Sequence, residues 1–159
     1  MTKYFRMLWL AASLAALLSP ALARAAGGEE PSTKATDPVV EQALAANAAR
    51  DYVRSAAILS QALERDPNNA DYHNLYAYAL RKGPNPDWNE VFRHYQEALR
   101  IDPDHRKAHE YLGEAYLMTG DLAKAKQQLA ALDRLCTFGC DEYSDLKKAV
   151  AAFEQIKPR

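Results

Sequence analysis

Residues 86–103 read PDWNEVFRHYQEALRIDP, and residues 50–67 read RDYVRSAAILSQALERDP. Both stretches have an aspartate at their second position, continue through a run with apolar residues at helical spacing, and end in Asp-Pro. A third stretch, residues 120–132, begins in the same way and reads GDLAKAKQQLAAL. Corresponding residues in successive stretches are 34 to 36 positions apart. Repetition at this period predicts helical hairpins that stack on one another.

Each feature that the three stretches share has a physical role in a helix. Asp51, Asp87 and Asp121 each precede an apolar-periodic run, where a carboxylate accepts hydrogen bonds from the free N–H groups of a helix start. Pro67 and Pro103 follow the runs, where a proline stops helix propagation. We therefore expect an all-α fold, with helices over residues 38–49, 52–65, 70–82, 87–100, 105–118 and 121–134.

The positions inside the runs predict how the two helices of a hairpin meet. Small residues recur where two helices must approach closely: Ser55, Val91 and Ala125. Larger residues recur one turn later and are expected to fill the space between the helices: Leu59, Tyr95 and Leu129.

These residues resemble the tetratricopeptide repeat (TPR) family. Leu112-Gly113, Tyr116 and Gly120-Asp121 match the family pattern in the third unit. The resemblance covers residues 36–135 and divides them into units 36–69, 70–105 and 106–135. The first unit departs from the pattern at Gln42-Ala43, and the second carries an insertion, Pro84-Asn85-Pro86. The resemblance implies a solenoid whose concave face is lined by the first helix of each hairpin.

That resemblance also implies which residues bind a partner. In the second and third units the groove positions are Asn74, Tyr78, Arg81, Lys82, Lys107, Glu110, Glu114 and Met118. In the first unit they are Val40, Leu44 and Asn47. Val40 and Leu44 stand where members that bind chaperone tails carry Lys and Asn, so that carboxylate clamp is absent. The tyrosines expected to pack between helices are Tyr72, Tyr76, Tyr95, Tyr111 and Tyr116.

Residues 136–159 form a Cys-x3-Cys turn and a helix that caps the last repeat. The helix begins at Asp141, and its apolar stripe is expected to cover the third hairpin while its polar side meets water. Cys136 and Cys140 are the only cysteines, and an oxidising compartment favours a disulfide between them. Two alternatives remain open: a soft-metal site for an ion such as Cu(I), and a redox-active pair.

The histidines offer little evidence for a metal site. His105 and His109 are four residues apart, but His105 follows Pro103 closely and is expected at or before a helix start. His73 and His94 occupy interior-type repeat positions and are expected to pack between helices. No nucleophile motif, phosphate-binding loop or zinc-protease motif occurs, so we expect no enzymatic activity, no metal and no cofactor.

Residues 1–26 have the layout of a cleaved secretory signal. A basic start with Lys3 and Arg6 precedes an uncharged apolar run over residues 7–18 and small residues at the cleavage region. Removing this segment takes away three basic and no acidic side chains, which lowers the net charge from −1 to −4. An acidic chain argues against nucleic acid as a partner, and no membrane span is expected after cleavage. Residues 27–37 contain no large apolar residue and are expected to be a flexible leader.

The sequence as a whole predicts an exported, most simply periplasmic, adaptor of the TPR type. It would hold a segment of another exported or envelope protein in its concave groove without catalysis. Two further hypotheses remain open. One is a metal-handling or redox accessory protein that uses Cys136 and Cys140, and the other is a self-assembling structural scaffold.

Overall fold

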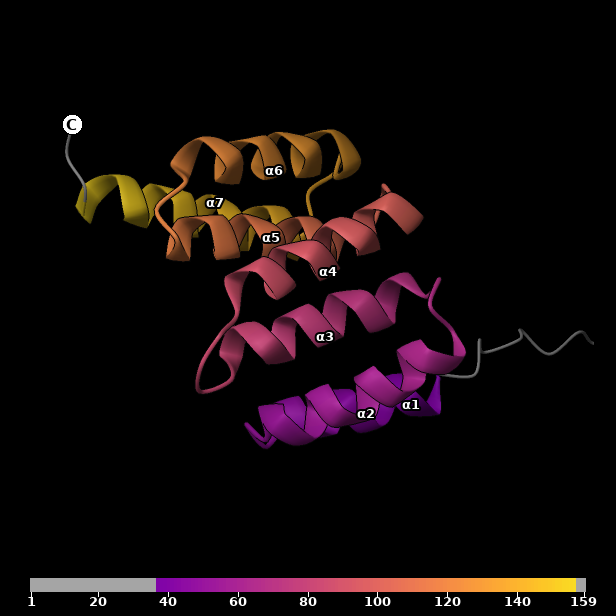
Figure 1. The fold of residues 1–159 in the computed structure, drawn as a ribbon. Coiled ribbons are helices and arrows are strands. Elements are labelled where there is room, and N and C mark those ends of the chain that lie inside the picture. The colour runs from indigo at the N-terminus through magenta and orange to yellow at the C-terminus, as the bar shows by residue number, and fades with distance from the viewer. Residues whose placement is uncertain (1–36, 157–159) are drawn as a thin grey trace, which may run out of the picture. The chain divides into compact units, whose positions relative to one another are not determined.

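The computed structural model describes residues 37–156. The signal segment at residues 1–26 and most of the leader lie outside this range. The described residues form seven helices and no strand: α1 (Pro38–Ala48), α2 (Tyr52–Arg65), α3 (Ala70–Lys82), α4 (Trp88–Ile101), α5 (Arg106–Met118), α6 (Leu122–Leu135) and α7 (Asp141–Ile156). Three antiparallel hairpins, α1–α2, α3–α4 and α5–α6, follow one another, and α7 packs against the last (Figure 1). The predicted all-α repeat fold is confirmed.

Capping carboxylates begin the second helix of each hairpin, as predicted. Asp51 accepts from the backbone N–H of Arg54 at 3.1 Å, and Asp121 accepts from that of Lys124 at 3.0 Å. Asp87 accepts from the N–H groups of the two residues that follow Trp88. One boundary needs correction: Asp37 is not part of a leader. Its side chain caps α1 and accepts a 2.6 Å hydrogen bond from the Tyr72 hydroxyl, which ties the first hairpin to α3.

The close-approach positions are confirmed by burial. Ser55, Val91 and Ala125 are each 0% exposed, and the Ser55 hydroxyl donates to the Ala43 carbonyl oxygen across the first hairpin. Leu59 and Tyr95 are also fully buried, while Leu129 is partly buried at the edge of the core.

Two imidazoles make the same link in successive units. His73 Nε2 lies 2.9 Å from the carbonyl oxygen of Pro67, and His109 Nε2 lies 2.9 Å from that of Pro103. The two pairs are 36 residues apart. Because each proline ends the preceding hairpin, each imidazole fixes the turn that leads into the next hairpin.

The turns within the first and third hairpins share one backbone geometry. Arg50 has a φ of 59° and Gly120 a φ of 86°, both in the left-handed region. In each turn the N–H of this residue bonds the carbonyl three residues earlier, and the next N–H bonds the carbonyl five residues earlier. This is the Schellman type of helix ending, for which glycine is the usual residue.

Helix α7 packs only against α5 and α6 among the described helices. Its Leu146 is 0% exposed and lies over Gly113 of α5. A β-carbon on Gly113 would come within 2.5 Å of Leu146 Cδ2, so the absence of a side chain there permits this close approach. None of the described helices is both long and apolar enough to cross a bilayer.

Candidate functional site: the concave groove

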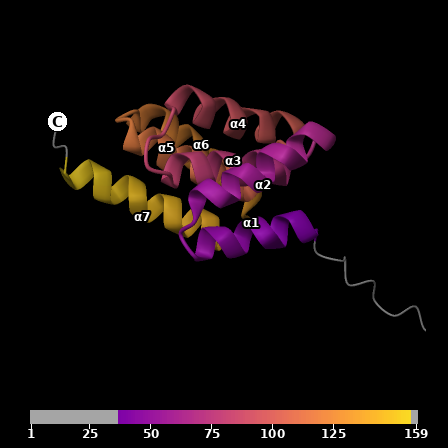
Figure 2. The same cartoon turned by 60° about the horizontal axis from the view of Figure 1, so that its bottom comes forward.

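The first helices of the hairpins, together with α7, form one layer of the molecule. Contacts run from α1 to α3, from α3 to α5 and from α5 to α7, whereas α2, α4 and α6 lie behind them. In Figure 2, α1 and α7 lie along the lower side of the molecule, with α3 and α5 above them. The sequence predicted this lining for α1, α3 and α5, but not for α7.

An aromatic and cationic cluster occupies the centre of the layer. The rings of Tyr78 and Tyr111 are 4.9 Å apart between centroids, and the Arg81 guanidinium lies 5.4 Å and 5.5 Å from those two centroids. Arg81 is only 4% exposed and forms a 2.8 Å ion pair with Glu114. Its Nη1 also approaches the Met118 sulfur at 3.6 Å. This cluster is a rigid floor, because its cation is already paired and enclosed by rings.

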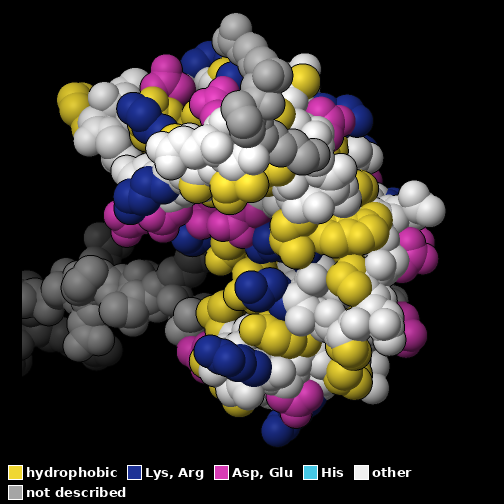
Figure 3. All heavy atoms as spheres, turned by 90° about the vertical axis from the view of Figure 1, so that its left-hand side faces the viewer, with side chains coloured by type: hydrophobic (Ala, Val, Ile, Leu, Met, Phe, Trp, Pro, Cys, Tyr) yellow, Lys and Arg dark blue, Asp and Glu magenta, His cyan; other side chains and the backbone are white. Residues whose placement is uncertain are grey.

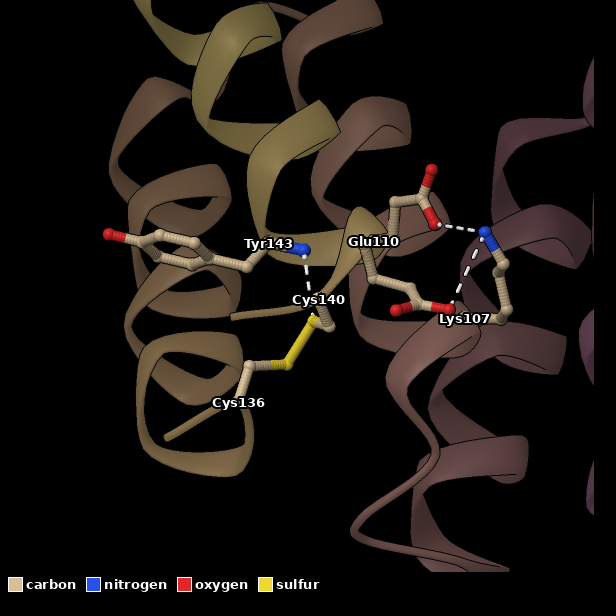
Figure 4. Close-up of a disulfide and its surroundings, with 6 residues drawn as sticks. Lys107, Glu110, Cys136, Cys140 and Tyr143 are labelled. Atoms are coloured by element: carbon tan, nitrogen blue, oxygen red, sulfur yellow. Dashed lines mark hydrogen bonds and ion pairs between the residues drawn. A yellow bond between two sulfur atoms is a disulfide. The ribbon is translucent and has the colours of Figure 1, made fainter. Parts of the chain in front are cut away.

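A second charged cluster joins α5 to the start of α7. Lys107 Nζ lies 3.0 Å from a carboxylate oxygen of Glu110 and 3.6 Å from one of Glu142 (Figure 4). Burial raises the pKa of Glu110, and the hydrogen bond from Lys107 only partly opposes that shift. In the face that Figure 3 shows, acidic side chains form a band across the middle, with hydrophobic and basic side chains below it.

An apolar hollow of about 390 Å³ opens between α5 and α7, beside Arg81 and Glu114. Its apolar lining residues are Leu117, Met118, Ala149, Ala152, Phe153 and Ile156. Met118 is 55% exposed and Ile156 is 80% exposed, so the rim presents hydrophobic surface to solvent. Half of the wall therefore comes from a helix that was expected only to cap the solenoid.

A smaller hollow of about 240 Å³ lies near the other end of the groove. Its lining residues are Leu44, Asn47, Ala48, Leu75, Tyr78 and Tyr111. Both polar side-chain atoms of Asn47 are buried and have no partner within residues 37–156, and the same holds for Oδ1 of Asn74. Buried amide groups nearly always have a hydrogen-bond partner, and for atoms with almost no accessible surface an enclosed water is the simplest one.

The eight residues predicted to bind a partner fall into two groups. Tyr78, Lys107 and Glu114 are half-buried, and Lys82 and Met118 are exposed. The other three are almost fully buried: Asn74 at 3%, Arg81 at 4% and Glu110 at 5% exposed. These three side chains lie beneath the groove surface and support the residues that form it. Their direct contact with a partner stays a prediction.

The groove residues of α7 were not expected from the sequence. Tyr111 packs between helices as expected, with its ring tilted by 42° against that of Tyr78 on α3, and it also lines the smaller hollow. The sequence feature that could have indicated a groove-facing side of α7 is the pair of small residues Ala149 and Ala152 next to its large apolar residues.

The histidines are used in packing and capping. His73 and His94 are buried with their Nδ1 atoms 2.7 Å apart, as expected for an interior pair. Because His73 Nε2 donates to Pro67, its Nδ1 accepts the proton of His94 Nδ1. His105 caps α5 through its Nδ1 and contacts Asp71 at 3.1 Å. No group of three or more potential metal ligands comes together within residues 37–156.

The two cysteines connect α6 to α7. Their sulfurs are bonded, with the Cα atoms 5.6 Å apart, and the loop between them turns at Gly139, where φ is 86° (Figure 4). Cys136 follows the last residue of α6, and Cys140 precedes the first residue of α7. The short bridge therefore fixes where α7 begins relative to α6.

Comparison with known proteins gives the family context of this architecture. Residues 85–135 match the tetratricopeptide repeat family. The fold is a TPR-like solenoid of helical repeats. A TPR repeat-containing thioredoxin, TTL4 of Arabidopsis thaliana, is 28% identical over 99 residues, which are 62% of this chain and 13% of that protein. The chain thus spans only a small part of that relative.

Solved TPR structures superimpose on the solenoid at low sequence identity. The type III secretion chaperone SycD of Yersinia enterocolitica, in complex with a peptide of the translocator YopD, gives a TM-score of 0.61 at 14% identity, covering 74% of this chain and 88% of SycD. The TPR2B domain of yeast Sti1, in a complex with pHsp70, gives 0.64 at 18% identity, covering 76% of this chain and 100% of the domain. At these identities the likeness shows the fold alone.

Proposed function

We propose that this solenoid is a non-catalytic adaptor that binds a segment of a partner protein along the groove formed by α1, α3, α5 and α7. The observation that carries the proposal is the closure of the groove by α7. It places an apolar hollow beside the Arg81–Glu114 ion pair and the aromatic centre of the groove. Such a surface suits a peptide that inserts an apolar side chain into the hollow while the rest of the segment lies along the tyrosine rings.

The ion pairs of the groove indicate which kind of partner segment it can bind. Arg81 is paired with Glu114, and Lys107 is shared by Glu110 and Glu142. A C-terminal carboxylate binds most strongly to a cation that has no other carboxylate partner, and neither Arg81 nor Lys107 is such a cation. We therefore propose that the solenoid binds an internal segment of its partner rather than a chain terminus.

Complexes of two proteins with a similar fold support the proposal that the ligand is a peptide segment. SycD was solved in complex with a peptide of YopD, and the Sti1 domain in a complex with pHsp70. For the present chain, the signal-like residues 1–26 and the Cys136–Cys140 bridge support an exported protein in an oxidising compartment, most simply the periplasm. The partner would then be another exported or envelope protein.

The test is in-cell photo-crosslinking from position 78 of the full chain, expressed in a Gram-negative host with its native partners. Tyr78 lies on the groove, and Gln127, exposed on α6, is the control position on the opposite layer. A discrete adduct from position 78 and none from position 127 is the expected result. Equal labelling from both positions, or none from position 78, would exclude the groove as the binding surface.

Two neighbouring alanines of α7 make the test specific. Ala152 lines the apolar hollow, whereas Ala151 is exposed on the same helix and is not part of the lining. An Ala152→Trp substitution should fill the hollow and remove the adduct, while Ala151→Trp should leave it intact. If both tryptophans act alike, the hollow has no part in binding.

A further inference from the structure

The two sulfurs of the bridge stand in opposite electrostatic environments. Cys140 occupies the residue before α7, its carbonyl accepts from Ser144 N–H at 3.2 Å, and its Sγ accepts from Tyr143 N–H at 3.4 Å (Figure 4). The sulfur thus takes the place that a serine or aspartate oxygen takes at a helix start. Cys136 instead caps the C-terminal end of α6, and its N–H bonds the Leu132 carbonyl.

This difference gives thiol–disulfide exchange a direction. Negative charge is stabilised at a helix N-terminus and destabilised at a C-terminus, so Cys140 is the better leaving thiolate. Nearby charges modify this preference: Asp141 and Glu142 in the first turn of α7 oppose a thiolate, while Lys107 is already bound to Glu142. The N–H···S hydrogen bond acts directly on Cys140 and has no counterpart at Cys136 among the described contacts.

The loop between the cysteines is exposed, while the two cysteines themselves are half-buried and Cys136 packs at the edge of the core. Thr137, Phe138 and Gly139 are exposed, and Phe138 is 102% exposed. No atom lies within 4 Å of the position that a β-carbon on Gly139 would occupy. Nothing among the described residues therefore covers the loop.

The bridge also holds a wall of the groove. Helix α7 has no second helix behind it and contacts only α5 and α6 within residues 37–156. Apart from the bridge, its N-terminal half is held by Leu146 over Gly113, by the packing of Tyr143 against the core and by the Lys107–Glu142 ion pair. Opening the bridge removes the covalent restraint on a helix that lines the apolar hollow.

We infer that the Cys136–Cys140 bridge is an exchange site for dithiols, attacked at Cys136, and that its opening loosens α7 and weakens groove binding. A thiolate of the dithiol attacks Cys136 Sγ, a mixed disulfide forms, and Cys140 leaves as a thiolate. The second thiolate of the dithiol then attacks its own sulfur in the mixed disulfide and releases Cys136. Two electrons pass from the dithiol, which becomes a disulfide, to the cysteine pair.

The direction of attack is tested with the oxidised full chain and reduced glutathione as a one-thiol probe. The reaction is stopped with acid, the free thiol is alkylated with N-ethylmaleimide, and fragment-ion mass spectrometry assigns both groups. Glutathione on Cys136 should exceed glutathione on Cys140 by about tenfold. An equal distribution, an excess on Cys140, or a bridge that does not react would overturn the assignment.

The release of α7 is tested by hydrogen exchange without any partner. Amides of residues 141–156 should exchange about tenfold faster in the Cys136→Ser/Cys140→Ser variant than in the oxidised chain, because a five-residue closure is lost. Residues 38–101 in α1 to α4 serve as the internal control and should not change. Unchanged protection in α7 would show that the bridge does not hold the wall.

The inference that opening the bridge weakens groove binding rests on the proposed function. Crosslinking from position 78 distinguishes a failure of this inference from a failure of the proposed function. Weaker crosslinking in the double-serine variant than in the oxidised chain supports control of groove binding by the bridge. Equal crosslinking in both forms excludes that control but leaves the binding function in place. No crosslinking in either form removes the binding function, and the mass spectrometry and hydrogen exchange still decide on the exchange site and the release of α7.

Discussion

The third hairpin and the two hairpins before it share a backbone plan but carry different residues at the same places. Gly113 on α5 corresponds to Ala77 on α3, which is fully buried and has a side chain. Gly120 has its counterpart in Arg50, and Gln128, which bonds His109 at 2.8 Å, has its counterpart in His94. At position 113 glycine is required because α7 approaches α5 closely there, whereas no helix makes the same approach at Ala77. In this chain the need for glycine on the first helix of a hairpin therefore depends on the neighbouring helix.

The largest effect is expected from Gly113→Leu. Its side chain would collide with Leu146 and displace α7, so we expect a loss of about 2–3 kcal/mol in the free energy of unfolding. Urea denaturation measures the loss, and hydrogen exchange locates it in residues 141–156. Gly113→Ala is the milder control, because the gain in helix propensity offsets part of the collision. A stability equal to that of the parent would show that α7 does not need the glycine.

A smaller effect is expected from acid at the His73–His94 pair. Burial lowers the pKa of His94 to about 4, with Arg93 and His73 adding to the shift, whereas an unfolded histidine titrates near 6.5. As the pH falls from 7 towards 4, the unfolded chain takes up a proton that the folded chain does not. The contribution is thus complete above about pH 6.5 and is lost as the pH approaches 4, by about 1–2 kcal/mol.

His94→Gln gives the second hairpin the residue of the third and serves as the test of this acid effect. Its free energy of unfolding should fall less steeply between pH 7 and pH 4.5 than that of the parent. Parallel curves for the two proteins would mean that His94 is not the titrating group.

The smallest effect is expected at the two left-handed turn residues. Arg50→Gly should stabilise the chain by about 0.5 kcal/mol, since glycine relieves the left-handed strain but adds freedom to the unfolded state. Gly120→Ala should destabilise it by a similar amount, about 0.5–1 kcal/mol. Thermal unfolding of both variants checks the signs. Changes of the same sign would show that the two turns are not equivalent.

The sequence predicted the hairpins well because their signals are local. Capping aspartates and terminal prolines act within one helical turn, and the observed helix ends agree with the expected ones to within one residue. The role of α7 was not predictable in the same way. Its position depends on Leu146 reaching a gap at Gly113, more than thirty residues earlier in the chain.

Three of the eight predicted groove residues, Asn74, Arg81 and Glu110, are almost fully buried, which repeat position alone does not predict. The Arg81 guanidinium lies near the rings of Tyr78 and Tyr111 and is paired with Glu114. Repeat position gives the direction of a side chain, but its neighbours on the next helix decide whether it reaches solvent.

The imidazole links at Pro67 and Pro103 have a mechanical consequence. Each link is one short hydrogen bond across the segment that joins a hairpin to the next, so it resists twisting of one unit against another. A change of angle at either junction that moves the proline carbonyl away from the imidazole breaks this bond, at a cost of about 1 kcal/mol.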